Sequence, residues 1–319
     1  MIGRAVIAVA IVEAVLTAVM VTIALDIYAH RRVEEFGGVN IWGYRGAVAP
    51  QRQQNDIRIE VVGGTRAYGW GEPAGSLGSQ IRRLMLLAID RPGAVVRPVT
   101  VVNVGRLGAL PDSYPGVIEH YAYLQPEIIC IYDDLGVRGG EPAERSAIFE
   151  LTGYAPALPV VLAEKGKAWR YGTVSRGYSL PSGSSSTSGP TRIAGTALEA
   201  VGDGLAAVDA GAARLLRSAP AAGPYADAMM TAIDAAHRRA QAVILVLSPA
   251  ETPGQRHNAA ALRQRLPDAA AASWLRIVDL DTEPRLRRDD LRYDGWNYGG
   301  VATTIAAEHV TPAVLSFIQ

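Results

Sequence analysis

Residues 58–71 read RIEVVGGTRAYGWG, and this stretch decides the fold. Its first five residues form a run suited to a β-strand, and the glycine pair after them allows a tight turn. The backbone amides after such a turn can open a helix, whose positive end favours an anion. The stretch therefore predicts a strand, a turn and a helix start in immediate succession.

Apolar, β-branched runs recur along the chain after this point, with helical stretches between them. The predicted strands are residues 58–62, 99–104, 127–132, 242–247 and 275–280. Continuous apolar runs of this length fit strands that helices cover on both faces, as in a parallel sheet. The sequence thus predicts an α/β protein with a doubly wound, mostly parallel five-stranded sheet.

The helices predicted around this sheet cover residues 77–89, 225–240, 259–266 and 301–318. Residues 135–223 form a longer segment than a crossover needs, and we interpret them as an insertion at the carboxyl edge of the sheet, where such folds bind ligands. Within the insertion we predict a short strand at 159–163. The run at 181–190, rich in serine, glycine and proline, cannot pack a core and is predicted to be mobile.

Composition narrows the classes of function. The chain has 319 residues with 31 basic and 31 acidic side chains, a balance that gives no electrostatic footprint for nucleic acid. Its single cysteine, Cys130, excludes an intrachain disulfide and a cysteine-rich metal site. Because Cys130 lies inside an apolar run, we expect it to pack as a small hydrophobic residue.

The N-terminal segment is predicted to anchor the chain in a membrane. Residues 5–25 are apolar except for Glu13, Thr17 and Thr22, and about 20 helical residues span a bilayer core. The segment is too long for a typical signal-peptide core and no clear cleavage site follows it, which favours an uncleaved signal anchor. We therefore divide the chain into a transmembrane anchor (1–27), a juxtamembrane connector (28–57) and a globular domain (58–319). Basic residues flank both ends of the anchor, so their count does not decide its orientation.

One face of the anchor helix carries small and polar residues. It comprises Ala10, Glu13, Ala14, Thr17 and Ala18. An ionisable group near the middle of a bilayer is costly, and a stripe of small residues lets a second helix approach closely. We therefore predict that this face contacts a helix of another membrane protein. The alternative is that Glu13 is protonated, or is tolerated in a tilted alanine-rich helix.

Four short blocks, each at a strand end or before the last helix, resemble those of the SGNH hydrolases. Residues 61–71 are similar to the block that carries the nucleophilic serine, with Thr65 at the serine position. Residues 101–108 resemble the second block, whose glycine amide helps to form the oxyanion hole, and Gly105 matches that glycine. Residues 126–133 resemble the approach to the third block, and Gly136 stands where its asparagine would complete the oxyanion hole. Residues 294–297 resemble the final Asp-x-x-His block, with Asp294 as the orienting aspartate and Asn297 at the position of the base.

Residues 40–46 also look like the connector of membrane-anchored members of this family, so the resemblance extends over nearly the whole chain outside the insertion. Members with such an anchor usually present the domain outside the cytoplasm. The resemblance therefore implies a cytoplasmic N-terminus and a periplasmic or extracytoplasmic domain.

The departures from the family pattern affect the chemistry directly. Acyl transfer needs an activated hydroxyl, a base and donors aimed at the oxyanion. Asn297 cannot accept a proton near neutral pH, and Gly136 has no side chain to donate. Thr65 retains a hydroxyl, although its methyl group crowds an attack geometry built for serine. The alternative is a base relocated to another histidine.

These observations favour a catalytically inactive member of the family that serves as a structural or accessory subunit of a membrane complex. It would need no cofactor or metal, since the acidic pair Asp133-Asp134 reads as a solvated loop start. Its partners would be other membrane-protein subunits, bound through the anchor helix and through the soluble domain, and not nucleic acid. One alternative is a weak or altered esterase or acyltransferase acting on envelope polysaccharide or lipid, with Thr65 as nucleophile. A second alternative is a sugar- or acyl-binding module.

Overall fold

The computed structural model describes residues 2–33, 39–40, 42–69, 73–89, 97–106, 108–136, 147–152, 154, 156–173, 176, 188–216, 224–266, 272–292 and 298–318. Within them, five parallel strands form one sheet in the order β2-β1-β3-β4-β5. The strands are β1 (Ile57–Gly63), β2 (Val99–Asn103), β3 (Ile128–Asp133), β4 (Ala242–Leu247) and β5 (Leu275–Asp279). The predicted α/β class and all five predicted strands are confirmed, each to within two residues at either end.

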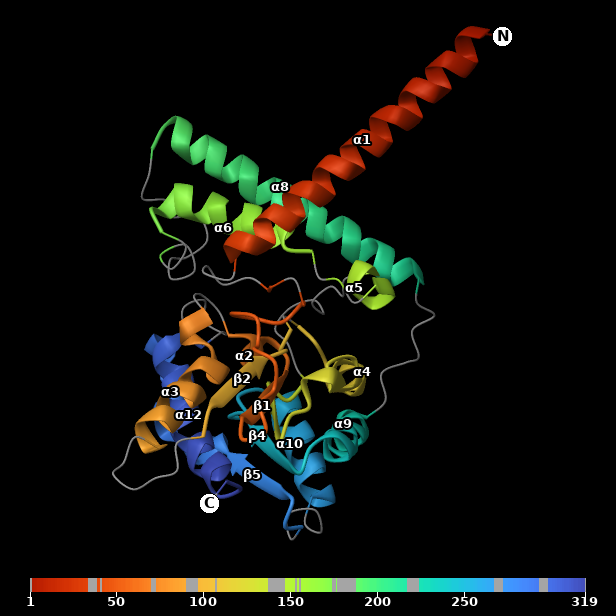
Figure 1. The fold of residues 1–319 in the computed structure, drawn as a ribbon. Coiled ribbons are helices and arrows are strands. Elements are labelled where there is room, and N and C mark those ends of the chain that lie inside the picture. Colours follow the sequence, from red (N-terminus) through yellow and green to blue (C-terminus); the bar gives the residue numbers. More distant parts are fainter. Residues whose placement is uncertain are drawn as a thin grey trace.

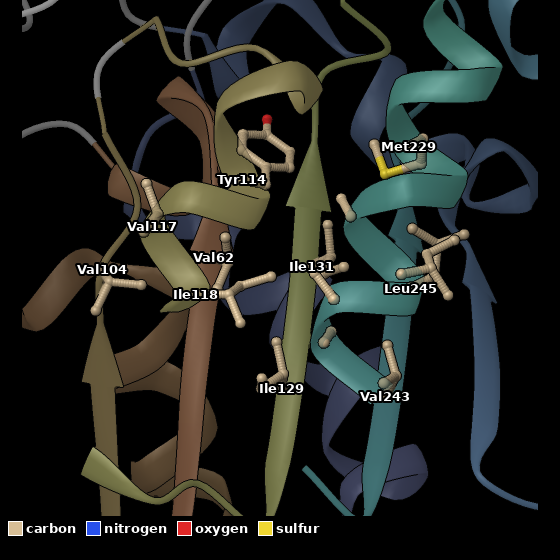
Figure 2. Packing of buried hydrophobic residues seen from close by; sticks show 14 of the residues in the cluster. Val62, Val104, Tyr114, Val117, Ile118, Ile129, Ile131, Met229, Val243 and Leu245 are labelled. Carbon is tan, nitrogen blue, oxygen red and sulfur yellow. The ribbon is translucent and has the colours of Figure 1, made fainter. Parts of the chain in front are cut away.

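Helices cover both faces of the sheet (Figure 1). One face packs against α3 (Leu77–Ile89) and α12 (Gly300–Leu315), and the other against α4 (Tyr114–His120), α9 (Tyr225–Arg239) and α10 (Pro253–Arg265). Alternation along β1 explains the division, because Ile59 and Val61 point into the first core and Val62 into the second. Figure 2 shows the second core, where Ile118 and Met229 lie over the strands.

The short elements connect these layers. They are α2 (Thr65–Tyr68), α5 (Ala147–Thr152) and the 3₁₀ turns Pro73–Gly75, Pro111–Ser113, Ala122–Leu124, Leu280–Thr282, Pro284–Arg287 and Asp289–Leu291.

Cys130 is fully buried in the first core, and burial raises the pKa of its thiol to about 12. It packs as a small hydrophobic residue, as predicted.

The inserted segment is helical where the structure describes it. Residues 159–163, predicted as a strand, belong to α6 (Leu158–Tyr171), which packs against α8 (Pro190–Leu216). The strand prediction was wrong, since this run forms part of a helix that packs against α8. Most of the serine-rich run at 181–190, namely 181–187, lies outside the described residues.

The N-terminal helix α1 extends over Ile2–Val33, six residues beyond the predicted end of the anchor at residue 27. Its segment Val9–Ala29 is long enough and apolar enough to cross a bilayer, by length and composition alone. Within the described side chains of α1, only Asp26 and Ala29 are buried by the rest of the chain. The domain boundaries at 27 and 57 stay predictions.

Candidate functional site

The turn after β1 holds Thr65 at the carboxyl edge of the sheet. Gly63 has φ +153°, and a Cβ there would lie 1.9 Å from the carbonyl oxygen of Tyr132. A Cβ on Gly64 would lie 2.8 Å from the carbonyl oxygen of Ala109. The backbone therefore passes too close to its neighbours for any residue but glycine, and α2 begins at once with Thr65.

The Thr65 side chain is partly buried and tied to the loop after β2. Its Oγ1 accepts a hydrogen bond from the Gly108 amide at 2.9 Å, which is the only hydrogen bond of this hydroxyl to the described residues. The first and second blocks therefore lie side by side in the structure, as the resemblance implies. Among the described residues, the partner of the hydroxyl is a backbone donor.

Gly105 lies against α2, where the resemblance implies an oxyanion donor. A Cβ on Gly105 would meet the Tyr68 nitrogen at 2.7 Å. Its amide donates to Oδ1 of Asn103 at 3.0 Å, and the Asn103 amide group donates in turn to the carbonyl oxygen of Ala67 at 2.9 Å. The Gly105 donor is therefore engaged within the fold.

Gly136 follows β3 in a left-handed conformation with φ +67°. The Tyr225 ring covers it so closely that a Cβ would lie 2.5 Å from Cδ2 of that ring. The Gly136 amide donates to Oδ2 of Asp133 at 3.1 Å. The position at which the family carries an asparagine has no room for a side chain in this packing.

Asp133 corrects the interpretation of the acidic pair as a solvated loop start, since it is only 2% exposed. Its carboxylate accepts hydrogen bonds from the hydroxyls of Tyr114 and Tyr225, the latter at 2.8 Å. Burial raises the pKa of Asp133 to about 7 and the neighbouring Asp134 adds to this, while the two tyrosine hydroxyls act in the opposite direction. Asp133 therefore joins β3 to α4 and α9 from inside the protein.

Arg66, the residue after Thr65, is buried and was not singled out from the sequence. Its guanidinium lies 4.1 Å from the centroid of the Tyr298 ring and 3.5 Å from a carboxylate oxygen of Glu251. Burial alone would lower the pKa of Arg66, but its acidic neighbours, Tyr298 first among them, raise it overall. Arg292 also pairs with Glu251, at 2.8 Å. The guanidinium of the residue after Thr65 is thus charged and paired with Glu251.

The structure describes the residues on either side of the last block but not the block itself. Asp294 and Asn297 lie outside the described residues, whereas Arg292 and Tyr298 on either side form an antiparallel bridge. The contact between Arg66 and Tyr298 brings this end of the chain to the turn after β1. The described residue that follows the last block, Tyr298, therefore lies beside the turn that carries the first block.

Two histidines, His237 and His309, contact residues away from Thr65. Nε2 of His309 lies 2.8 Å from a carboxylate oxygen of Glu283, and the His237 ring stacks on Trp274 at 3.8 Å between centroids. No described histidine hydrogen-bonds Thr65. Within the described part of the chain, no cluster of three metal-ligating side chains is found.

The predicted helix-contact residues Ala10, Glu13, Ala14, Thr17 and Ala18 are all exposed on α1. None of the described residues covers this face. Its proposed role in contacting another helix stays a prediction.

A scan against protein-family models found no match, and a search of curated proteins found none. Solved structures with a similar chain path include a protein assigned to the G-D-S-L lipolytic family from Desulfitobacterium hafniense, with 12% identity over 80% of this chain and 98% of the other and a TM-score of 0.41. A family 3 carbohydrate esterase from Clostridium thermocellum matches with 12% identity over 81% of this chain and 98% of the other, also with a TM-score of 0.41. A family two carbohydrate esterase from the same organism, solved with cellohexaose, matches with 10% identity over 85% and 67% and a TM-score of 0.41. At these identities the likeness is one of fold, and it assigns no role to any residue of this chain.

Proposed function

We propose that this chain is a catalytically inactive relative of the SGNH hydrolases, held at a membrane by α1, which serves as a structural or accessory subunit of a membrane complex. The observation that carries the first half of this proposal is the state of the oxyanion positions. The Gly105 amide is bound to Asn103, and Tyr225 occupies the space over Gly136. The oxyanion of an acyl-transfer intermediate would therefore have neither a free Gly105 amide nor room for a donor side chain at position 136.

The chemical consequence is large. Loss of one oxyanion donor costs about 10²- to 10³-fold in kcat, and loss of the base is comparable or worse. Asn297 stands at the base position in the sequence, and the Thr65 hydroxyl accepts from a backbone amide. Together these features support a site that keeps the family's architecture without its reactivity.

The second half of the proposal rests on α1. Its polar and small face, with Glu13 four residues after the start of the candidate span Val9–Ala29, is left uncovered by the described part of the chain. Because an intramembrane carboxyl group is costly without a partner, a helix of another subunit is the proposed contact. On the strength of the family resemblance, the proposal includes a cytoplasmic N-terminus and a globular domain outside the cytoplasm.

Purification of the full chain from native membranes in mild detergent tests the subunit role. We expect defined membrane proteins to co-purify with the wild type, to be lost with Glu13→Ala and to be retained with Val12→Ala, which alters the opposite face of α1. Recovery of the wild type as a lone monomer would argue strongly against the proposal.

The alternative of a weak esterase is tested on the same material. Incubation with an activated ester and a serine-directed probe should give no labelling above that of Thr65→Ala. Labelling that disappears in Thr65→Ala would establish Thr65 as a nucleophile and replace the inactive-subunit proposal.

One observation favours the binding-module alternative. A hollow of about 390 Å³ is lined by Trp42, Tyr44, Arg58 and Tyr123 among others, and Trp42 and Tyr123 are half exposed with ring centroids 6.1 Å apart. Exposed aromatic faces beside polar groups suit a sugar ring. Saturable binding of soluble oligosaccharides that Trp42→Ala abolishes would support this function. Thr65 does not line the hollow, so such binding would be independent of the former catalytic position.

A further inference from the structure

The α6–α8 hairpin is built around glycines. A Cβ on Gly202 would lie 2.5 Å from the carbonyl oxygen of Pro159, and a Cβ on Gly166 would lie 2.5 Å from that of Gly195. Ion pairs reinforce the contact, with Glu199 of α8 bound to Lys167 and Arg170 of α6. The two helices therefore form one unit, and α8 presents a different side to its surroundings.

That other side of α8 is apolar and exposed. Ile193 is 69% exposed, Val201 53%, Leu205 37% and Val208 73%, and their spacing places all four on one helical face. The neighbouring helix α5, which packs against α8, adds Leu151 at 70%. A continuous face of large apolar side chains of this kind marks an interaction surface.

The position of α1 indicates what covers this face. The Asp26 carboxylate accepts hydrogen bonds from the amides of Ala157 at 2.9 Å and Leu158 at 2.6 Å, and also from the Tyr154 hydroxyl. Asp26 thus ties α1 to the first turn of α6. Because Asp26 lies three residues before the end of the candidate span at Ala29, the hairpin is fixed within about 5 Å, measured along α1, of the end of the apolar segment.

Figure 1 shows the same relation in space, since α5, α6 and α8 lie on the side of the sheet from which α1 runs away. Three charged side chains of α8, Arg192, Glu199 and Asp203, lie off the apolar face, as in helices that rest in a membrane interface. A fourth, Asp209, lies at the edge of this face and accepts a hydrogen bond from the Ile148 amide of α5 at 3.1 Å.

We propose that the apolar face of α8 lies in the interfacial layer of the bilayer that α1 crosses, so that the hairpin sets the domain at a fixed height and tilt on the membrane. The inference rests on the proposed membrane anchoring by α1. It requires no catalytic activity and no partner subunit.

Site-directed fluorescence on the full chain tests this placement. The only native cysteine, Cys130, is buried with a raised thiol pKa, so an introduced cysteine can be labelled selectively. Val208→Cys, Thr196→Cys and Leu16→Cys would each carry an environment-sensitive fluorophore in phosphatidylcholine nanodiscs. Thr196 is the matched control, because it is exposed on α8 away from the apolar face. Leu16 reports on insertion of α1.

We expect a lipid-attached quencher to lower the emission at Val208 at least about twofold more than at Thr196, and iodide in the buffer to show the reverse order. If Leu16 is quenched from the lipid but Val208 is quenched by iodide as strongly as Thr196, the α8 placement is wrong while the anchor stands. If the label at Leu16 is not quenched from the lipid, both the anchoring by α1 and the placement of α8 are wrong. If the label at Val208 is protected from iodide only at high protein concentration and is not quenched from the lipid, the apolar face of α8 contacts a second copy of the chain. That result would overturn the proposal.

Discussion

At the scale of single residues, Gly136 and Tyr225 show how the position at which the resemblance implies an oxyanion donor is filled. The Tyr225 ring packs on the Gly136 backbone while its hydroxyl donates to Asp133. One aromatic side chain therefore occupies the space of the expected asparagine and satisfies a buried carboxylate. Both contacts would have to change before an amide could reach an oxyanion.

Replacing Gly136 by asparagine, the residue of the family pattern, should therefore destabilise the protein. The left-handed backbone tolerates asparagine, so the cost comes from overpacking against Tyr225 and is about 1–3 kcal/mol. Gly172→Asn is the matched control, since Gly172 has φ +87° and open space around it. Thermal unfolding in detergent measures both variants, and equal stability of the two would contradict the packing described here.

Asp133 predicts a pH dependence. Its pKa is raised by burial from an unfolded value of about 3.9 to about 7, so the folded protein binds more protons than the unfolded chain between these values. Stability from this group is therefore complete below about pH 4 and is lost as the pH rises through about 7. Asp133→Asn cannot titrate, so the stability advantage of the wild type over this variant should shrink from pH 4.5 to pH 7.5. Melting temperatures at the two pH values check this, and a constant or growing advantage would be inconsistent with a raised pKa.

Sequence reasoning located Thr65, Gly105 and Gly136 because each follows a strand, and strand ends meet at one edge of a parallel sheet. It missed Arg66 and misread Asp133, because burial depends on which distant side chains cover a position. Tyr114, Tyr225 and Tyr298, which decide those environments, come from segments far away in the chain.

At the scale of elements, close approach of α6 and α8 is the feature most sensitive to mutation. Gly202→Ala places a Cβ against the backbone of α6, 2.5 Å from the Pro159 oxygen and 2.7 Å from the Ala163 nitrogen, and should cost about 1–3 kcal/mol. Gly204→Ala meets nothing within 4 Å and should be neutral or stabilising by up to about 1 kcal/mol through helix propensity. Hydrogen exchange of the α6 amides in the two variants measures the difference. Similar protection in both would show that the helices are not in contact through glycine.

The elements of the sheet were predictable because long apolar runs can only be buried strands or buried helices, and their flanking turns decide between them. The helix α10 was predicted to start at 259 but begins at Pro253, after a capping box formed by Thr252 and Gln255. A capping box can be recognised from sequence alone, so this one could have predicted the correct start of α10. The helical state of 159–163 had a weaker signal, the proline at position 159 in the first turn of α6, and no side-chain cap precedes it.

At the scale of the whole molecule, the parallel sheet brings the turn that carries Thr65 to one edge, where Tyr298 from near the end of the chain also lies and where the candidate site is placed. The anchor and the α6–α8 hairpin lie on the side of the sheet where that site lies, at the carboxyl ends of the strands (Figure 1). This arrangement suits a domain whose role is to be positioned at a membrane.

Restoring the serine and the histidine of the family pattern tests catalytic inactivity most directly. In the double variant Thr65→Ser with Asn297→His, the nucleophile and base types return, but the Gly105 amide and the Gly136 position stay closed. Hydrolysis of an activated acetyl ester by this variant should remain within about tenfold of the Thr65→Ala background, because the oxyanion donors alone are worth about 10²- to 10³-fold each. A rise of about 10³-fold or more that a Thr65→Ala, Asn297→His control lacks would show that the oxyanion hole is open and that the site is a hydrolase site after all.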